Sequence, residues 1–168
     1  MQEKKQKQFL VTETLLASHG QRFLNLFMDY IGQLIVFFIV LEIAASIAME
    51  NGNKDFITGF IKNDIMQYTF ATGVSLLYYN IFEIFTARTL GKLVTQTIVV
   101  NEYGEKPHYE VVLLRSLCRL IPFEILSFIG MPPRGWHDSL SKTYVVKKRE
   151  LEEMKLKFYS LHETKEED

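Results

Sequence analysis

A long apolar stretch near the amino-terminus, residues 22–49, constrains the fold of this chain more than any other feature. As an α-helix it would be roughly 40 Å long, which exceeds the roughly 30 Å hydrocarbon core of a bilayer. Ser18 and Gln21 have the spacing of a capping box at a helix start. A signal peptide fits poorly, because the stretch begins too late, is too long and contains Asp29 and Glu42. The sequence therefore predicts a transmembrane helix that tilts or protrudes.

A second apolar stretch covers residues 65–86 and would form a helix about 33 Å long, enough for one crossing. Tyr68, Tyr78 and Tyr79 lie toward its ends, where amphipathic rings prefer the bilayer interface. Hydrophobic residues make up 48% of the chain and gather in blocks between charged segments, which is a membrane distribution. We therefore predict a transmembrane helical hairpin, rather than two buried helices of a soluble bundle.

A third apolar stretch, residues 109–130, contains features that are unfavourable in the middle of a bilayer. Arg115 and Arg119 lie one helical turn apart within it, and Pro122 interrupts it. We predict an interfacial or re-entrant helix with its arginines at the headgroups. A full third crossing is the alternative, since long arginine side chains can reach the interface from within the membrane.

Basic residues indicate which side of the membrane each end of the hairpin faces. The amino-terminal segment contains Lys4, Lys5 and Lys7, and further basic residues follow the second and third apolar stretches. The loop between the first two stretches, residues 50–64, has more acidic than basic side chains. Because positive charge marks the cytoplasmic side, both termini are predicted to be cytoplasmic.

The predicted cytoplasmic parts contain two short strands and one helix. Residues 93–100 are rich in β-branched side chains, and residues 143–146 form a second strand candidate, so we expect a small β-ribbon. In the charged tail, residues 147–168, an amphipathic helix is indicated by Leu151, Met154, Phe158 and Leu161. The predicted fold is an all-α membrane protein, with a membrane domain over residues 1–146, the ribbon and this C-terminal helix.

Polar side chains follow one face of each predicted membrane helix. In the first helix they are Arg22, Asn25, Asp29 and Gln33. In the second they are Thr72, Ser75, Tyr79, Glu83 and Thr86. In an antiparallel hairpin the two stripes face each other, and Glu83 lies at the level of Asn25. We therefore predict a cluster of Arg22, Asp29 and Glu83 toward the cytoplasmic side, with Asp138 nearby by topology. Arg22 and Asp29 are two turns apart, too far for a tight pair, so their partners are expected from other segments.

A carboxylate at membrane depth is costly unless it is paired or hydrated, which makes Asp29 a candidate for exchanging a proton or a small cation. The alternative is that the stripes only hold the helices together through hydrogen bonds and ion pairs. A contact with a lipid headgroup or a partner is a third reading. Glu42 lies on nearly the opposite helix face, where a contact within an oligomer explains it most simply.

His137 and Asp138 follow a turn at the expected cytoplasmic interface. A histidine next to an aspartate can relay protons near neutral pH, although a polar residue at headgroup level is the simpler reading. Asp138 is expected either to cap the segment that follows it or to pair with Arg115 or Arg119.

The sequence does not favour an enzyme. Its single cysteine, Cys118, excludes an intramolecular disulfide and any multi-cysteine zinc site, and the four histidines lack metal-ligand spacing. No phosphate-binding loop or dinucleotide fingerprint is present, and the basic residues form no nucleic-acid-binding surface. We expect no cofactor, no metal and no catalytic residue. A transporter and an accessory protein that recruits partners through its ribbon and tail remain as hypotheses.

Several segments together resemble the RDD family of small bacterial membrane proteins, which is named for one arginine and two aspartates. They are Arg22-Phe23, Asp29-Tyr30, Arg88-Thr-Leu-Gly-Lys92, Val99-Val100, Gly104, Pro107, Leu114-Arg-Ser-Leu-Cys-Arg-Leu-Ile-Pro122, Arg134-Gly-Trp-His-Asp138 and Thr143-Tyr-Val-Val146. The resemblance covers most of the chain.

This resemblance implies that Arg22, Asp29 and Asp138 are the namesake residues. It also implies a multi-pass protein of the bacterial inner membrane with a transport-related function, since some members are similar in behaviour to sodium/proton antiporters. The expected partners are the lipid bilayer, monovalent cations or protons, and a second copy or a membrane protein. A chain this short is expected to transport a solute only as an oligomer.

Overall fold

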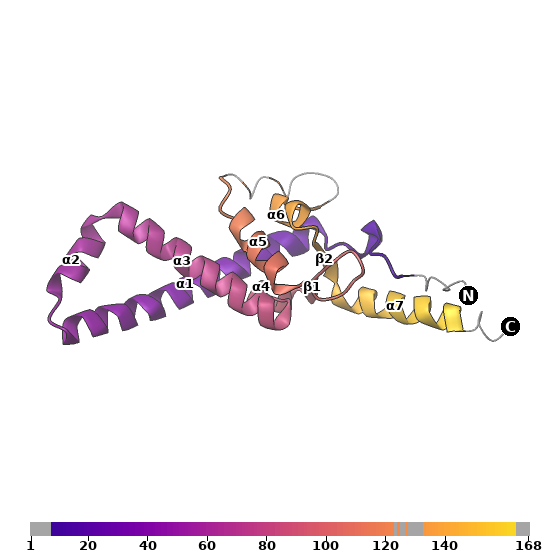
Figure 1. Ribbon diagram of the computed structural model, residues 1–168, viewed down its shortest axis with the longest axis horizontal. Helices are drawn as coiled ribbons and strands as arrows, with labels where there is room; N and C mark the ends of the chain where they lie inside the picture. The colour runs from indigo at the N-terminus through magenta and orange to yellow at the C-terminus, as the bar shows by residue number, and fades with distance from the viewer. Residues whose placement is uncertain (1–7, 123, 125–126, 128–132, 164–168) are drawn as a thin grey trace, which may run out of the picture.

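Helices form most of the chain in the computed structural model, which describes residues 8–122, 124, 127 and 133–163 (Figure 1). The helices are α1 (His19–Glu50), α2 (Lys54–Lys62), α3 (Asp64–Thr86), α4 (Leu90–Val94), α5 (Tyr109–Cys118), α6 (Trp136–Leu140) and α7 (Lys148–Glu163). The strands are β1 (Thr97–Val100) and β2 (Tyr144–Lys147). The molecule is elongated, with the α1–α3 hairpin at one end and α7 at the other.

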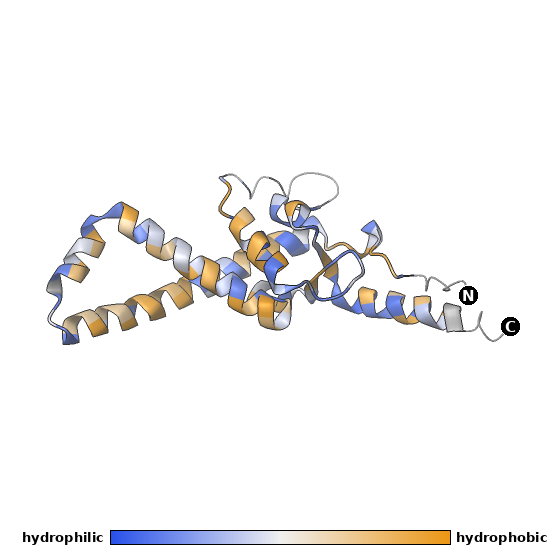
Figure 2. Ribbon diagram, in the orientation of Figure 1, coloured by the Kyte–Doolittle hydropathy of each residue, from blue (hydrophilic) through white to orange (hydrophobic). Residues whose placement is uncertain are grey.

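Helix α1 begins at the predicted capping box, in which the Ser18 hydroxyl accepts from the Gln21 amide and the Gln21 side chain accepts from Ser18. Within the described ranges it is the one helix that is long and apolar enough to cross a membrane. Its apolar half is visible in Figure 2. The first predicted crossing is therefore supported by length and composition. Helix α3 is long enough but does not reach the same composition, so the second crossing stays a prediction.

The hairpin opens toward α2, which joins the far ends of α1 and α3 (Figure 1). Aromatic rings fill the space between the three helices there. The ring of Phe70 in α3 lies edge-on to Phe37 of α1 at 5.4 Å and to Phe60 of α2 at 5.5 Å. The half of the hairpin away from α2, called the hairpin base below, instead contains polar side chains.

The predicted ribbon is present as an antiparallel pair of β1 and β2, in which Ile98 lies opposite Val146. The amino-terminal arm extends it, since Ala17 donates to the Val145 carbonyl. A small apolar core joins the arm, the ribbon and α7 through Phe9, Leu15, Leu16, Val100, Val146 and Leu151. Sequence patterns did not indicate the contribution of the arm, because no periodicity marks it.

The predicted strand over residues 93–100 is shorter, because β1 begins at Thr97 and residues 90–94 form α4. The reason is tertiary: the Asp29 carboxylate of α1 accepts from the Thr89 hydroxyl and the Gly91 amide at the start of α4. These hydrogen bonds fix a helical turn that β-branched composition alone disfavours.

The predicted third helix over residues 109–130 also ends earlier, since α5 stops at Cys118 and turns follow up to Pro122. Part of the predicted range, residues 123, 125–126 and 128–132, lies outside the described residues. A ten-residue helix is about 15 Å long, so α5 by itself does not span a bilayer, and the alternative of a full crossing over residues 109–130 stays a prediction. Arg115 is fully buried in protein, not at headgroups as predicted.

Helices α1 and α4 touch backbone to backbone at Gly91. A Cβ atom at this position would overlap the Asn25 backbone of α1. Gly91→Ala should therefore lower the free energy of unfolding in detergent by about 1–3 kcal/mol, because the helices must separate. The matched control is Gly73→Ala in α3, where nothing lies within 4 Å of the added Cβ and no loss is expected. Equal melting temperatures for the two variants would contradict this packing.

Candidate functional site

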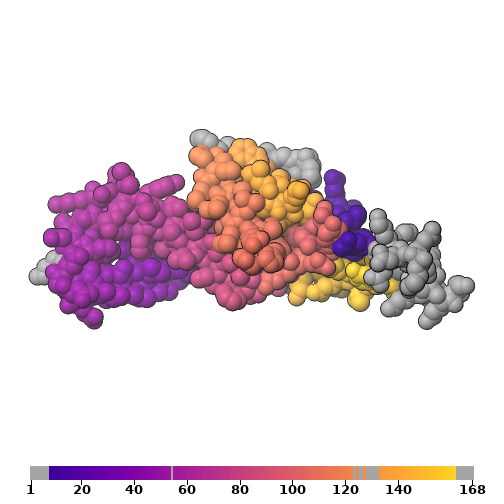
Figure 3. Space-filling view, viewed as in Figure 1, coloured from indigo at the N-terminus to yellow at the C-terminus, as the bar shows by residue number. Residues whose placement is uncertain are grey.

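Charged side chains that are distant in sequence meet inside the hairpin base. They come from α1, α3, α4, α5, α6 and the segment between α5 and α6, and they form what we call the polar network. Its charged members are Arg22, Asp29, Glu83, Lys92, Arg115, Arg119, Glu124, His137 and Asp138. Carboxylates and cationic lysine or arginine side chains are equal in number, so the network is neutral when His137 is neutral. In Figure 3 the α5 and α6 segment lies against the hairpin base.

Glu83 of α3 is the most heavily paired carboxylate of the network. It is fully buried, and its oxygens lie 3.0 Å from Lys92 Nζ, 3.1 Å from Arg115 Nε and 3.0 Å from Arg119 Nη2. The Arg119 guanidinium also lies over the Tyr79 ring, 3.6 Å from its centroid. Burial of one carboxylate among three cations holds α3, α4 and α5 together.

Asp138 of α6 is a second fully buried carboxylate, and it pairs with Arg22 Nη1 at 2.5 Å and Arg115 Nη1 at 2.8 Å. Arg115 therefore bridges Glu83 and Asp138. Burial raises the pKa of Asp138, but the charges of Arg115, His137 and Arg22 outweigh it and hold that pKa well below its ordinary value. Asp138 is ionised in the folded protein at neutral pH.

The four residues of the predicted cluster, Arg22, Asp29, Glu83 and Asp138, lie in one network. Arg22 pairs with Asp138, which is 116 residues away in the sequence. Glu83 pairs with cations from α4 and α5. Partners from other segments were expected, but spacing along α1 and α3 could not identify Lys92 or Arg115 as the partners of Glu83.

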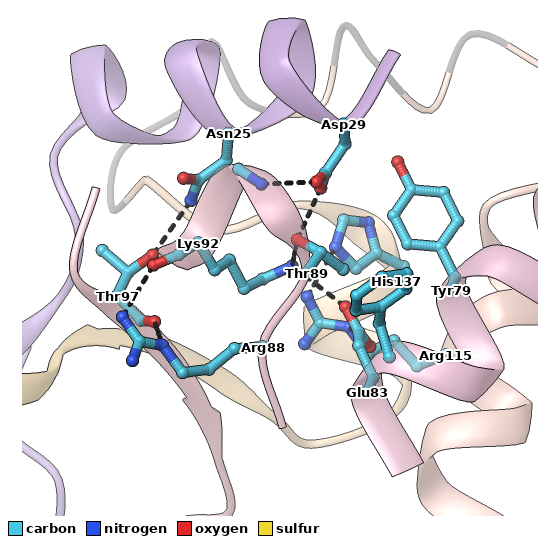
Figure 4. Close-up of polar contacts among 12 residues, drawn as sticks. Asn25, Asp29, Tyr79, Glu83, Arg88, Thr89, Lys92, Thr97, Arg115 and His137 are labelled. Atoms are coloured by element: carbon cyan, nitrogen blue, oxygen red, sulfur yellow. Dashed lines mark hydrogen bonds and ion pairs between the residues drawn. The ribbon is translucent and has the colours of Figure 1, made fainter. Parts of the chain in front are cut away.

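Asp29 is bound differently from the other buried carboxylates. It is 2% exposed and accepts hydrogen bonds from the Tyr78 hydroxyl at 3.0 Å, the Thr89 hydroxyl at 2.7 Å and the Gly91 amide at 2.7 Å. Figure 4 shows the contacts toward α4. In the described part of the chain no lysine, arginine or histidine nitrogen lies within ion-pair distance of it. Its donors are thus neutral groups.

The polar stripes of α1 and α3 face each other, as their spacing predicts. Gln33 accepts from the Ser75 hydroxyl at 2.8 Å and donates to the Tyr79 hydroxyl at 3.0 Å. Asn25 instead contacts the Thr97 hydroxyl at the start of β1. The stripes therefore join the two helices and tie α1 to the ribbon.

His137 lies inside the network and not at a headgroup surface. It is 3% exposed, its Nδ1 lies 2.5 Å from Glu124, and its Nε2 lies 3.1 Å from Arg115 Nη2. Its Nε2 also lies 3.2 Å from Asp138 Oδ1, so the ring contacts two carboxylates and one guanidinium. Burial raises the pKa of Glu124, but hydrogen bonding and charge from His137 lower it overall.

A small, partly open cavity of about 50 Å³ is lined by members of the network. A cavity of this size holds at least one water molecule when polar groups line it. Its polar lining consists of Arg22, Asn25, Asp29, Lys92, Arg119, Glu124 and His137. Asp29, which has no lysine, arginine or histidine partner among the described residues, therefore borders a space large enough for water or a small cation.

The model of the RDD family matches residues 16–141 of this chain. The chain belongs to the RDD family. Neither the curated proteins nor the solved structures include a match to it. The matched range contains every member of the polar network, whereas β2 and α7 follow it. With the apolar helix α1, family membership indicates a membrane protein and confirms the resemblance seen in the sequence.

Arg22, Asp29 and Asp138, which the resemblance implies are the RDD namesake residues, have two different roles in the structure. Arg22 and Asp138 form a buried ion pair, while Asp29 holds the start of α4. Sequence reasoning missed Lys92, Thr89 and Glu124 as network members. Lys92 is one of the basic residues that follow the second apolar stretch, and in the sequence only its place in the family-like segment Arg88-Thr-Leu-Gly-Lys92 distinguishes it.

Proposed function

We propose that this RDD protein exchanges a proton or a monovalent cation across the bacterial inner membrane, with Asp29 as the carboxylate that binds it. The observation that carries the proposal is the buried Asp29 carboxylate, held by neutral donors and bordering a polar cavity. Glu83 and Asp138 are neutralised by arginines, so they are poor candidates for a mobile cation. Asp29 has room to gain one.

Physical chemistry supports this choice. Hydrogen bonds from neutral donors hold the Asp29 carboxylate in place without supplying a counter-charge. A cation or proton that reaches this carboxylate is surrounded mostly by protein, where electrostatic attraction is stronger than in water. An ionisable side chain at membrane depth is also costly to keep there, which makes it a candidate for a functional role.

The proposed topology places α1 and α3 across the bilayer with both termini in the cytoplasm. Large apolar side chains are exposed along both helices, among them Phe38 and Ile43 in α1 and Ile81 and Phe85 in α3. Such surfaces need lipid or protein cover. The polar network then lies toward the cytoplasmic side, and α2 lies at the outer side.

We propose further that the active form is an oligomer. Glu42 is exposed on α1 between apolar residues, where a lipid contact would be costly. A second copy of the chain supplies a polar partner for it. An oligomer also provides the walls of a transport path that one hairpin cannot enclose.

The test is sodium-dependent pH change in vesicles that contain the purified protein. Asp29→Asn should reduce exchange at least tenfold. The amide has nearly the same size as the carboxylate and can still form hydrogen bonds, but it has no charge to bind a cation and no acidic proton to release. The control is Asp55→Asn, which removes an exposed carboxylate of α2 and should leave exchange unchanged. Wild-type exchange in a correctly folded Asp29→Asn variant would refute the proposal.

An accessory function is the second candidate, and the surface of α7 favours it. Leu156 and Leu161 are exposed there, and α7 points away from the hairpin (Figure 1). Leu151 and Phe158, by contrast, pack on the amino-terminal arm and ribbon, so the predicted stripe is partly used within the chain. Double substitution of Leu156 and Leu161 by glutamine should remove a co-purifying membrane partner if this function operates, without affecting exchange.

A further inference from the structure

A buried lysine in α4 connects to Asp29 through a hydroxyl group. Lys92 is 3% exposed, and its Nζ donates to Glu83 Oε1 at 3.0 Å and to Thr89 Oγ1 at 3.3 Å. The Thr89 hydroxyl in turn donates to Asp29 Oδ2 at 2.7 Å. Lysine, threonine and aspartate thus form one continuous hydrogen-bonded path (Figure 4).

We propose that Lys92 carries the proton that leaves when a monovalent cation binds at Asp29, and that the Thr89 hydroxyl passes this proton between them. The inference rests on the proposed function. It identifies Lys92 as the group that releases one proton for each monovalent cation that binds. Net charge in the network is then the same before and after exchange, because an ammonium is replaced by one monovalent cation.

Proton transfer along this path begins at Lys92. Lys92 gives a proton to Thr89 Oγ1 while the hydroxyl proton of Thr89 passes to Asp29 Oδ2, which leaves a neutral amine on Lys92 and a carboxylic acid on Asp29. The carboxylic acid releases its proton to water in the cavity, and the monovalent cation binds the resulting carboxylate. No oxidant, reductant or further reactant is required.

The surroundings of Lys92 favour release of its proton. Burial lowers the pKa of Lys92, and the charges of Arg119 and Arg115 on α5 lower it further. Glu83 on α3 and Asp29 on α1 act in the opposite direction. A cation at Asp29 cancels one of these two stabilising charges, so binding itself drives the lysine toward its neutral form.

Lys92→Arg tests the proposal, because arginine keeps the positive charge but does not lose its proton in proteins. Two readouts are needed: sodium-dependent pH change in vesicles, and proton release on sodium addition to the detergent-purified protein. Wild type should release one proton per sodium ion bound. Lys92→Arg should release none and should lose exchange at least tenfold, while Lys62→Arg in exposed α2 should behave as wild type.

Thr89→Val provides a second, nearly isosteric test that keeps Lys92. It removes the hydroxyl and should slow exchange at least tenfold, and Thr89→Ser should restore it. Wild-type exchange in folded Lys92→Arg overturns the role of Lys92, and if that variant does not fold, wild-type exchange in Thr89→Val does so. Exchange that is absent from wild type refutes the proposed function instead, so the two failures are distinguishable.

Discussion

Replacing Arg115 by methionine should lower the free energy of unfolding by about 3–5 kcal/mol, a large fraction of the stability of a typical protein. Arg115 is fully buried and bridges two carboxylates, at 3.1 Å from Glu83 and 2.8 Å from Asp138. Methionine has a similar volume, so the loss comes from charge and not from a cavity. Asp138 and Glu83 would each keep other cations, but their remaining partners cannot hold α5 and α6 together.

Thermal and denaturant unfolding in detergent would measure this change. The matched control is Arg149→Met in α7, whose pair with Glu153 is largely exposed. Exposed pairs contribute little, so this variant should unfold as wild type does. An Arg115→Met protein as stable as Arg149→Met would show that the polar network is not what holds the hairpin base together.

Regular periodicity explains which parts of the fold the sequence could predict. The apolar stretch and the capping box place α1 because both depend on neighbours along the chain. Gln33 and Ser75 face each other because both follow the helical spacing of their stripes and the two helices run antiparallel in the hairpin. The β-ribbon was predictable for the same reason, since β-branched residues mark both strands.

The pair of Asp138 with Arg115 is one of the alternatives that the sequence left open, but most other partners within the site could not be predicted in this way. Arg22 meets Asp138 only because α6 folds back over the hairpin base, and no local pattern encodes that distance of 116 residues. Residues 93 and 94 belong to a helix because Asp29 holds Gly91, so a tertiary contact overrides local preference. In the sequence, Lys92 resembles an ordinary basic residue at the end of a membrane helix, whereas in the structure it is buried next to Glu83.

Asp138→Asn should destabilise the protein by about 3–5 kcal/mol at neutral pH, and this difference from wild type should shrink in acid. The substitution leaves Arg22 and Arg115 buried without the charge that both contact. The pKa of Asp138 is depressed in the folded state, so its contribution is complete above the unfolded pKa of about 3.9 and is lost as the pH falls toward the folded value.

Below pH ~4 wild type should therefore lose stability more steeply than Asp138→Asn, by about 1.4 kcal/mol per pH unit for one additional proton. Unfolding curves between pH 3 and pH 7 measure the difference directly, and carboxylates shared by both proteins cancel from it. Glu152→Gln, which removes an exposed carboxylate of α7, should follow wild type at every pH. If the free energies of unfolding of wild type and Asp138→Asn changed with pH in the same way, Asp138 would have the same pKa in the folded and unfolded states. That result is incompatible with a buried carboxylate held between two arginines.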